Sequence, residues 1–126
     1  MKQMFLLFSH QLTPYQKEDA RASLNVKHFI SLPDNLQELW SHIPTDMQEL
    51  SNYLHPLKEY LQQNAKKDDI VLVQGDFCAV YEMVNFCKSL QLIPVCSTTK
   101  REVQDVKQGD KVIKTSLFKH IIYRRY

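Results

Sequence analysis

The stretch between residues 70 and 90 constrains the fold more than any other part of the sequence. Four consecutive apolar residues, Ile70–Val73, are followed by Gln-Gly-Asp at 74–76 and then by a long, mostly apolar run. A short, continuously apolar run bounded by turn residues is typical of a strand that is buried on both faces. Gly75 is one of only two glycines in the chain. The stretch therefore predicts a buried strand, a tight turn and a helix, which is the unit of an α/β fold.

The rest of the chain alternates short apolar runs with helical patterns, which is typical of a mainly parallel sheet with helices on both faces. Further strands are predicted at residues 4–8, 26–32 and 92–95, and residues 112–125 as one long or two short strands. No crossover helix precedes the last segment, so we expect an antiparallel C-terminal strand or hairpin. Pro94 places the fourth strand near an edge of the sheet or at an irregularity.

Capping residues mark where the first helix begins. Thr13 and Gln16 form a capping box around Pro14, ahead of a helix that ends near Leu24. An amphipathic helix is predicted next, because apolar residues recur at i, i+3, i+4 and i+7: Leu36, Leu39, Trp40 and Ile43.

A further helical stripe is predicted between residues 45 and 61. Thr45 with Gln48 offers a second capping box, and Pro56 should kink or break the helix near residues 53–56. The apolar positions of this stripe are Met47, Leu50, Leu54, Leu57 and Leu61. Residues 97–110, in contrast, are interpreted as a polar connection, with residues 102–110 as either a lid or a disordered loop.

The length of 126 residues suits one domain over residues 1–126, long enough to bury a core without disulfides or metal. The chain is 44% hydrophobic and 24% charged, which is ordinary for a soluble globular protein. The apolar run at residues 4–8 is too short for a signal peptide, and no stretch is long enough to span a membrane. We therefore expect a cytoplasmic protein without a membrane partner.

The formal net charge of +2 gives no strong attraction to duplex DNA. Positive charge gathers towards the C-terminus, at residues 98–101 and 118–126, so the sequence does not exclude a small anionic ligand.

Cys78, Cys87 and Cys96 are odd in number and form no C-x-x-C motif. They are interpreted as free, buried thiols in a reducing compartment.

Polar residues follow three of the predicted strands. Because ligands of open α/β sheets bind outside the carboxyl ends of the strands, we expect these residues to meet at one edge. The helix after residue 76 directs its N-terminal N–H groups to the same edge, which favours a phosphate. The predicted anion site, which also suits a nucleobase or ribose, consists of Ser9, His10, Gln74, Gly75, Asp76, Ser97, Thr98, Thr99, Lys100 and Arg101.

Each of these residues also has a plainer interpretation. Asp76 is a preferred N-cap residue, and its charge would oppose a phosphate placed directly on it. Gly75 alone indicates only a tight turn. His10 is equally consistent with a surface histidine, and residues 98–101 with a solvated loop.

Several chemistries have no support in the sequence. There is no G-x-G-x-x-G, no G-x-x-x-x-G-K-[ST] and no G-x-S-x-G motif. The five histidines show neither H-x-x-x-H nor H-E-x-x-H spacing, so a dedicated zinc site is not expected. We expect no metal and no cofactor.

The predicted helix over residues 77–90 is apolar around much of its circumference and must be covered on two sides. The sheet covers one side, and a neighbouring helix or a two-fold partner covers the other. We expect a homodimer through this helix. One apolar stripe is formed by Phe77, Val80, Tyr81, Val84 and Cys87, and the other by Ala79, Met83, Phe86 and Leu90.

Five blocks of sequence resemble the small accessory proteins of type III CRISPR systems: MFLLFSHQLT, LPDNLQELWSHIP, VLVQGDFCAVYEMVNF, LIPVCSTTKRE and SLFKHIIYRRY. That family is a minimal relative of the CRISPR-associated Rossmann-fold (CARF) sensor domain and has ring nuclease activity. The resemblance spans nearly the whole chain. It implies a single CARF-like Rossmann domain and a homodimer that binds cyclic oligoadenylate, the second messenger of type III immunity, and opens the ring to end the signal.

The implied chemistry needs no metal, because a ribose 2′-OH attacks the adjacent phosphate and leaves a 2′,3′-cyclic phosphate and a 5′-OH. The protein has to align these groups and stabilise the charge that develops on the phosphoryl oxygens. Lys100 or Arg101 would supply a cation, and His10 a general acid or base, because histidine titrates near neutral pH. Lys119 and His120 are weaker candidates. The ligand would be held by Ser9, Gln74, Gly75, Asp76, Thr98 and Thr99.

Two rival functions remain open. A sponge or sensor would bind cyclic oligoadenylate without cleaving it, and binding uses the same donors as alignment. An interaction subunit of the same fold would bind no nucleotide, and its basic strand-end residues would be dispensable.

Overall fold

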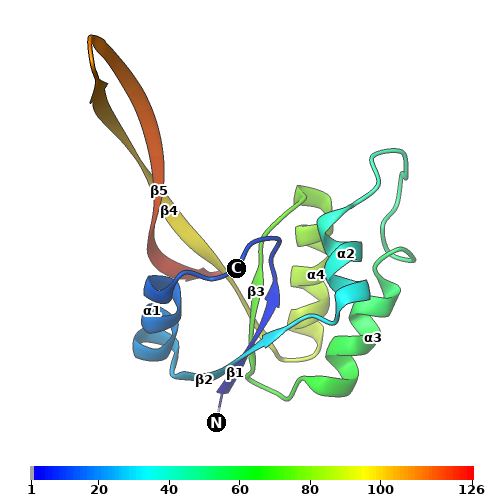
Figure 1. Cartoon of the computed structure of the whole chain (residues 1–126). Coiled ribbons are helices and arrows are strands. Elements are labelled where there is room, and N and C mark those ends of the chain that lie inside the picture. Colours follow the sequence, from blue (N-terminus) through cyan, green and yellow to red (C-terminus); the bar gives the residue numbers. More distant parts are fainter. Residues whose placement is uncertain (1) are drawn as a thin grey trace.

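A five-stranded sheet forms the centre of the molecule in the computed structural model, which describes residues 2–126 (Figure 1). The strand order is β2-β1-β3-β4-β5; the first four strands are parallel, and β5 is antiparallel to β4. The chain is thus a mixed α/β protein with a mostly parallel sheet and an antiparallel C-terminal pair, as predicted. Its elements are β1 (Lys2–Leu7), α1 (Pro14–Leu24), β2 (Val26–Ser31), α2 (Asp34–Ser41), α3 (His55–Asn64), β3 (Ile70–Val73), α4 (Phe77–Ser89), β4 (Ile93–Gln108) and β5 (Lys111–Arg125).

Helices cover both faces of the sheet, which confirms that prediction. Alternating side chains of β1 enter two separate apolar clusters, because successive residues of a strand point to opposite faces. Phe5 and Leu7 pack with residues of α2, α3 and α4, including Trp40. Met4 packs on the opposite face with Ala20 of α1. All four residues of β3 are fully buried between these layers.

The predicted capping box of α1 is confirmed. The Gln16 N–H donates to Thr13 Oγ1 at 3.2 Å, and the Thr13 N–H donates to Gln16 Oε1 at 2.9 Å. Asn25 ends the helix in the left-handed region, with φ at 57°. These local signals fix the direction in which the chain leaves β1 and returns to β2.

The predicted helical stripe from residue 45 to 61 is only half correct. Residues 42–54 form turns and bends, and α3 begins at His55. Pro56 occupies the first turn of α3, where its missing N–H costs nothing, so it starts a helix instead of breaking one. Leu54 is nevertheless fully buried. The apolar spacing therefore reports core burial only for Leu54, Leu57 and Leu61, since Met47 is exposed, and no helix forms at the Thr45–Gln48 capping box.

The prediction of a polar connection at residues 97–110 is wrong. β4 continues to Gln108 and forms a long hairpin with β5. The strand shows no clean alternation because both faces of this part of the hairpin are exposed to solvent. Pro94 lies in a strand next to the sheet edge, between β3 and β5, and its carbonyl accepts the Tyr126 N–H at 3.1 Å.

None of the helices within residues 2–126 is long and apolar enough to cross a membrane. The three cysteines are free, as predicted. Cys87 is buried and Cys96 is half-buried, but Cys78 is exposed on α4, so the prediction of burial is fully confirmed only for Cys87 and is wrong for Cys78.

Candidate functional site at the carboxyl edge of the sheet

The connections at the carboxyl ends of the strands diverge around β1. The loop after β1 leads to α1 on one face, whereas those after β2 and β3 lead to α2 and α4 on the other face (Figure 1). Such divergence opens a crevice on each side of the loop that follows β1. The chain thus places pockets at the edge where the sequence predicted a ligand site.

Three pockets lie along this edge. The β1–β2 pocket has a volume of about 510 Å³ and is lined by residues that include Phe8, His10, Lys17, Phe29 and Gln37. The β1–β3 pocket, of about 270 Å³, is lined by Phe8, Ser9, His10, Gln74 and Gly75. The β3–β4 pocket, of about 570 Å³, is lined by Gln74, Gly75, Phe77, Val80, Cys96, Ser97, Thr98, Thr99, Arg124 and Tyr126.

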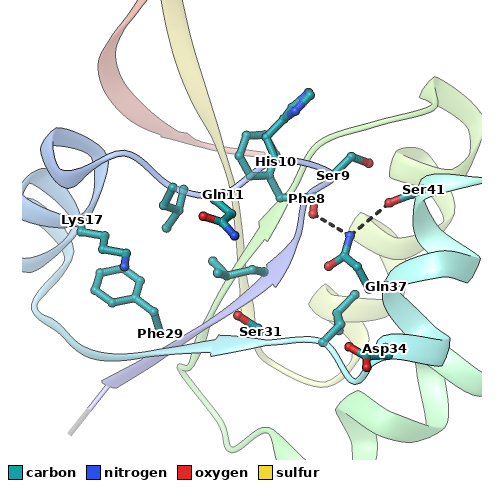
Figure 2. A pocket seen from close by; sticks show the side chains of 13 residues that line it. Phe8, Ser9, His10, Gln11, Lys17, Phe29, Ser31, Asp34, Gln37 and Ser41 are labelled. Carbon is teal, nitrogen blue, oxygen red and sulfur yellow. Dashed lines mark hydrogen bonds between the residues drawn. The ribbon is translucent and has the colours of Figure 1, made fainter.

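The β1–β2 pocket combines aromatic walls with polar groups (Figure 2). The Gln37 side-chain amide donates to the Phe8 carbonyl at 2.9 Å and to Ser41 Oγ at 3.1 Å. No hydrogen bond within residues 2–126 uses the Gln37 side-chain oxygen, so that oxygen is an available acceptor. Lys17 Nζ lies 5.9 Å from the centroid of the Phe29 ring. The pocket can therefore hold a planar ring beside an anion.

Gln74 joins the two remaining pockets, because it lines both. Its side-chain oxygen accepts the Ser97 N–H at 2.8 Å, and its carbonyl accepts Trp40 Nε1–H at 3.0 Å. The adjacent Gly75 lies against the same indole, where an added Cβ would be 3.3 Å from Trp40. The rare glycine thus lies where an added side chain would crowd the Trp40 ring.

Asp76 is the N-cap of α4, as predicted. Its carboxylate accepts the N–H groups of Cys78 and Ala79, both at 3.0 Å. These two donors are therefore occupied by the protein's own carboxylate, and the end of α4 offers less to a phosphate than the sequence suggested.

Some of the predicted site residues line the three pockets, and others lie outside them. Ser9 and His10 share the β1–β3 pocket with Gln74 and Gly75, and Thr98 and Thr99 line the β3–β4 pocket. Lys100 and Arg101 line none of the three pockets: they lie on the hairpin. The Arg101 guanidinium donates instead to Ser116 Oγ at 2.9 and 3.1 Å.

Two cations that the sequence analysis missed do line pockets, namely Lys17 and Arg124. Lys17 lies in the first turns of α1, the helix that follows the carboxyl end of β1. This position next to the predicted ligand edge could have identified it as a candidate. Arg124 is opposite Cys96 in the antiparallel register of β4 and β5, which no local pattern reveals.

His120 belongs to a buried network that ties the base of the hairpin to α1. Its Nε2 lies 2.6 Å from Asp19 Oδ2, and its Nδ1 lies 2.5 Å from Ser97 Oγ. The Gln16 amide donates to the same hydroxyl at 3.3 Å. Ser97 and His120 are each only 5% exposed. The residue types match a catalytic triad, but Ser97 and His120 are almost wholly buried and the hydroxyl is already bonded to Gln16 and His120, so we interpret the network as structural.

Tyr126 closes the β3–β4 pocket near the chain terminus. Its hydroxyl donates to the Val73 carbonyl at 2.6 Å, and burial, with the neighbouring Cys96, raises the pKa of its phenol to about 12. It therefore acts at neutral pH as a hydrogen-bond donor. Within residues 2–126, no cluster of three or more His, Cys, Asp or Glu side chains could hold a metal ion.

The chain is thus a mixed α/β protein with a row of polar and aromatic pockets along the carboxyl edge of its sheet. The sequence matches the model of the uncharacterized protein MJ1673 family over residues 2–124, and the chain belongs to that family. It is 53% identical over 126 residues to the uncharacterized protein MJ1673 of Methanocaldococcus jannaschii, covering 100% of this chain and 98% of that relative. No solved structure matches the chain.

Proposed function

We propose that the chain is a CARF-like Rossmann domain of the cytoplasm, and a ring nuclease that binds and linearises cyclic oligoadenylate of type III CRISPR signalling. The observation that carries this proposal is the continuity of the carboxyl edge, where Gln74 borders two pockets and the loop after β1 borders a third. A ring of alternating phosphates and adenines needs polar and aromatic surfaces in such a row.

The phosphates would be held by hydroxyl and amide groups of Ser9, Gln74 and Thr99, with Lys17 and Arg124 as the cations. An adenine would occupy the β1–β2 pocket against Phe8 or Phe29, because bases stack on aromatic side chains. The oxygen of Gln37 would accept a hydrogen bond from the adenine amino group.

The reaction is an internal transfer that needs no water and no metal. A ribose 2′-oxygen loses its proton and bonds to the adjacent phosphorus, while the bond from phosphorus to the 5′-oxygen breaks and that oxygen takes up a proton. His10 is exposed at the junction of two pockets and would exchange one of these protons. Its ring packs edge-on against Phe8, with centroids 5.5 Å apart, which restricts its orientation.

Calorimetric titration with cyclic tetra-adenylate and cyclic hexa-adenylate in EDTA tests the ligand class. We expect binding of at least one ring, and weaker binding of linear tetra-adenylate with ordinary ends. We expect His10→Ala to slow turnover more than it weakens binding, and the exposed-site control His55→Ala to change neither. Absence of binding to both rings would contradict both the ring nuclease and the sponge.

A non-catalytic sponge is the second candidate. Two observations favour it: Asp76 occupies the first donors of α4, and Lys100 and Arg101 do not reach the chain's own pockets. The pockets therefore have fewer free donors and cations to stabilise the negative charge of a transition state. Binding of the ring depends less on these groups. A sponge would return the ring intact after prolonged incubation, whereas an interaction subunit would not bind it.

A further inference from the structure

The outer part of the β4–β5 hairpin has no support from the rest of the chain. Within residues 2–126, β4 pairs with β3 only at residues 93–95, and beyond residue 99 its cross-strand partners all belong to β5. Figure 1 shows the hairpin extending well away from the helices and the sheet. Eight of its apolar side chains are at least 41% exposed: Val103, Val106, Val112, Ile113, Leu117, Phe118, Ile121 and Ile122.

Both faces of this hairpin carry apolar residues. Val106 and Ile113 form a cross-strand pair and therefore share one face. Phe118, opposite Arg101, and Val112, opposite Lys107, point to the other face. An isolated two-stranded ribbon is only marginally stable in water, and an exposed apolar edge invites pairing with another chain. The hairpin therefore needs a partner surface.

The same molecule exposes a matching surface on α4. Phe77 is 92% and Tyr81 is 71% exposed, although the predicted 77–90 interface would bury them. They border a pocket of about 570 Å³ whose lining includes Leu50, Glu49 and Glu82. This acceptor face, as we call it, combines aromatic side chains with the carboxylate of Glu49.

We infer that the hairpin is an arm that packs on the acceptor face of a second copy of this chain. The hairpin leaves one side of the carboxyl edge, and the acceptor face, with residues 48–51 and the start of α4, lies on the other side (Figure 1). A two-fold axis through this edge places the arm of each copy on the acceptor face of the other, which makes the contact reciprocal and closed.

Charge and size agree with this occupant. Lys107, Lys111 and Lys114 of the outer hairpin suit the carboxylate of Glu49, whereas Glu82 is already paired with Lys58 Nζ at 2.8 Å in its own chain. The nine cross-strand pairs from Lys100–Lys119 to Gln108–Lys111 make a ribbon roughly 30 Å long and about 10 Å wide. One arm and one acceptor face then bury roughly 600 Å² per copy, most of the about 800 Å² of a standard interface. Exposed aliphatic side chains fit a protein surface better than a nucleic-acid backbone.

The arm does not depend on the proposed function, and cross-linking tests it directly. Cys78 is exposed and lines the acceptor face, so Ile113→Cys places a second thiol on the arm. With a short bismaleimide we expect a covalent dimer of twice 14.9 kDa that joins residue 113 of one copy to residue 78 of the other. Adding Cys78→Ser should abolish it. The control Glu18→Cys, on the exposed side of α1, should give no cross-link to Cys78.

A second measurement keeps the inference testable if cross-linking is inefficient. The double variant Val106→Thr and Ile113→Thr keeps β-favouring residues in the arm and should raise the dimer dissociation constant at least about tenfold in analytical ultracentrifugation. A monomer of 14.9 kDa in the unmodified protein, a dimer unaffected by the double variant, or a 113–113 cross-link in place of the 113–78 link would overturn the proposed arrangement.

Discussion

The indole of Trp40 packs directly over Gly75, so closely that an added Cβ would stand 3.3 Å from the ring. The same indole donates its N–H to the carbonyl of Gln74 at 3.0 Å. Trp40 thus fixes the turn between β3 and α4 from the side of α2. Because Gln74 borders two of the three edge pockets, the packing of one core residue determines the shape of the candidate site.

Gly75→Ala should therefore destabilise the protein by about 1–3 kcal/mol, the usual effect of forcing an extra carbon into a packed position. It should also weaken ring binding, because Gln74 would move with the turn. Urea unfolding and calorimetry measure the two effects. Gly109→Ala is the control: nothing lies within 4 Å of its added carbon, so only the turn of the hairpin is strained and ring binding should be kept. Equal binding losses in both variants would contradict this explanation.

His120→Ala should destabilise the protein by about 2–4 kcal/mol, because it leaves a cavity and removes one of the two hydrogen-bond partners of the buried Ser97 hydroxyl. We expect faster amide hydrogen exchange at the base of the hairpin, where His120 is linked to Asp19 of α1. The control His55→Ala removes only an exposed contact with Glu59. A loss of less than about 0.5 kcal/mol, the range of surface substitutions, would show that the network does not hold the hairpin.

The sequence predicted the parts of the fold and of the candidate site that local signals determine. Ile70–Val73 and the capping box of Thr13 were predicted correctly, because burial on both faces and end-capping leave unmistakable patterns. The antiparallel C-terminal strand was predicted, but the extension of β4 to Gln108 was missed because this part of the strand faces solvent on both sides and shows no alternation. Arg124 was missed for a different reason: it lies in a predicted strand, but it reaches the site only through the cross-strand register with Cys96.

Stability should fall at alkaline pH through Cys87. Burial raises the pKa of its thiol from the ordinary 9.0 to about 12. The unfolded chain therefore releases this proton from about pH 9 upwards while the folded chain retains it, so the contribution is complete below pH 9 and declines as the pH rises towards 12. Urea unfolding at pH 8 to 10.5 under reducing conditions should show a shallower decline for Cys87→Ala than for the unmodified protein. Parallel declines would contradict the assignment.

Arg124→Gln should weaken binding of cyclic tetra-adenylate at least about tenfold, the usual order for a lost charge-assisted contact. The neighbouring Arg125→Gln is a matched control, because Arg125 does not line the β3–β4 pocket. Titration calorimetry at two salt concentrations separates a local contact from general charge. If the two variants lose the same affinity, the cation acts only through the overall field.

The most direct test of the central claim is the identity of the product formed from cyclic tetra-adenylate in EDTA. Cleavage by the 2′-OH gives a linear chain with a 2′,3′-cyclic phosphate and a 5′-OH, which has the same mass as the ring and must be separated by chromatography. We predict that this product appears with the unmodified protein, and much more slowly with His10→Ala. Recovery of the intact ring from a complex that binds it tightly would contradict the nuclease and leave a sponge.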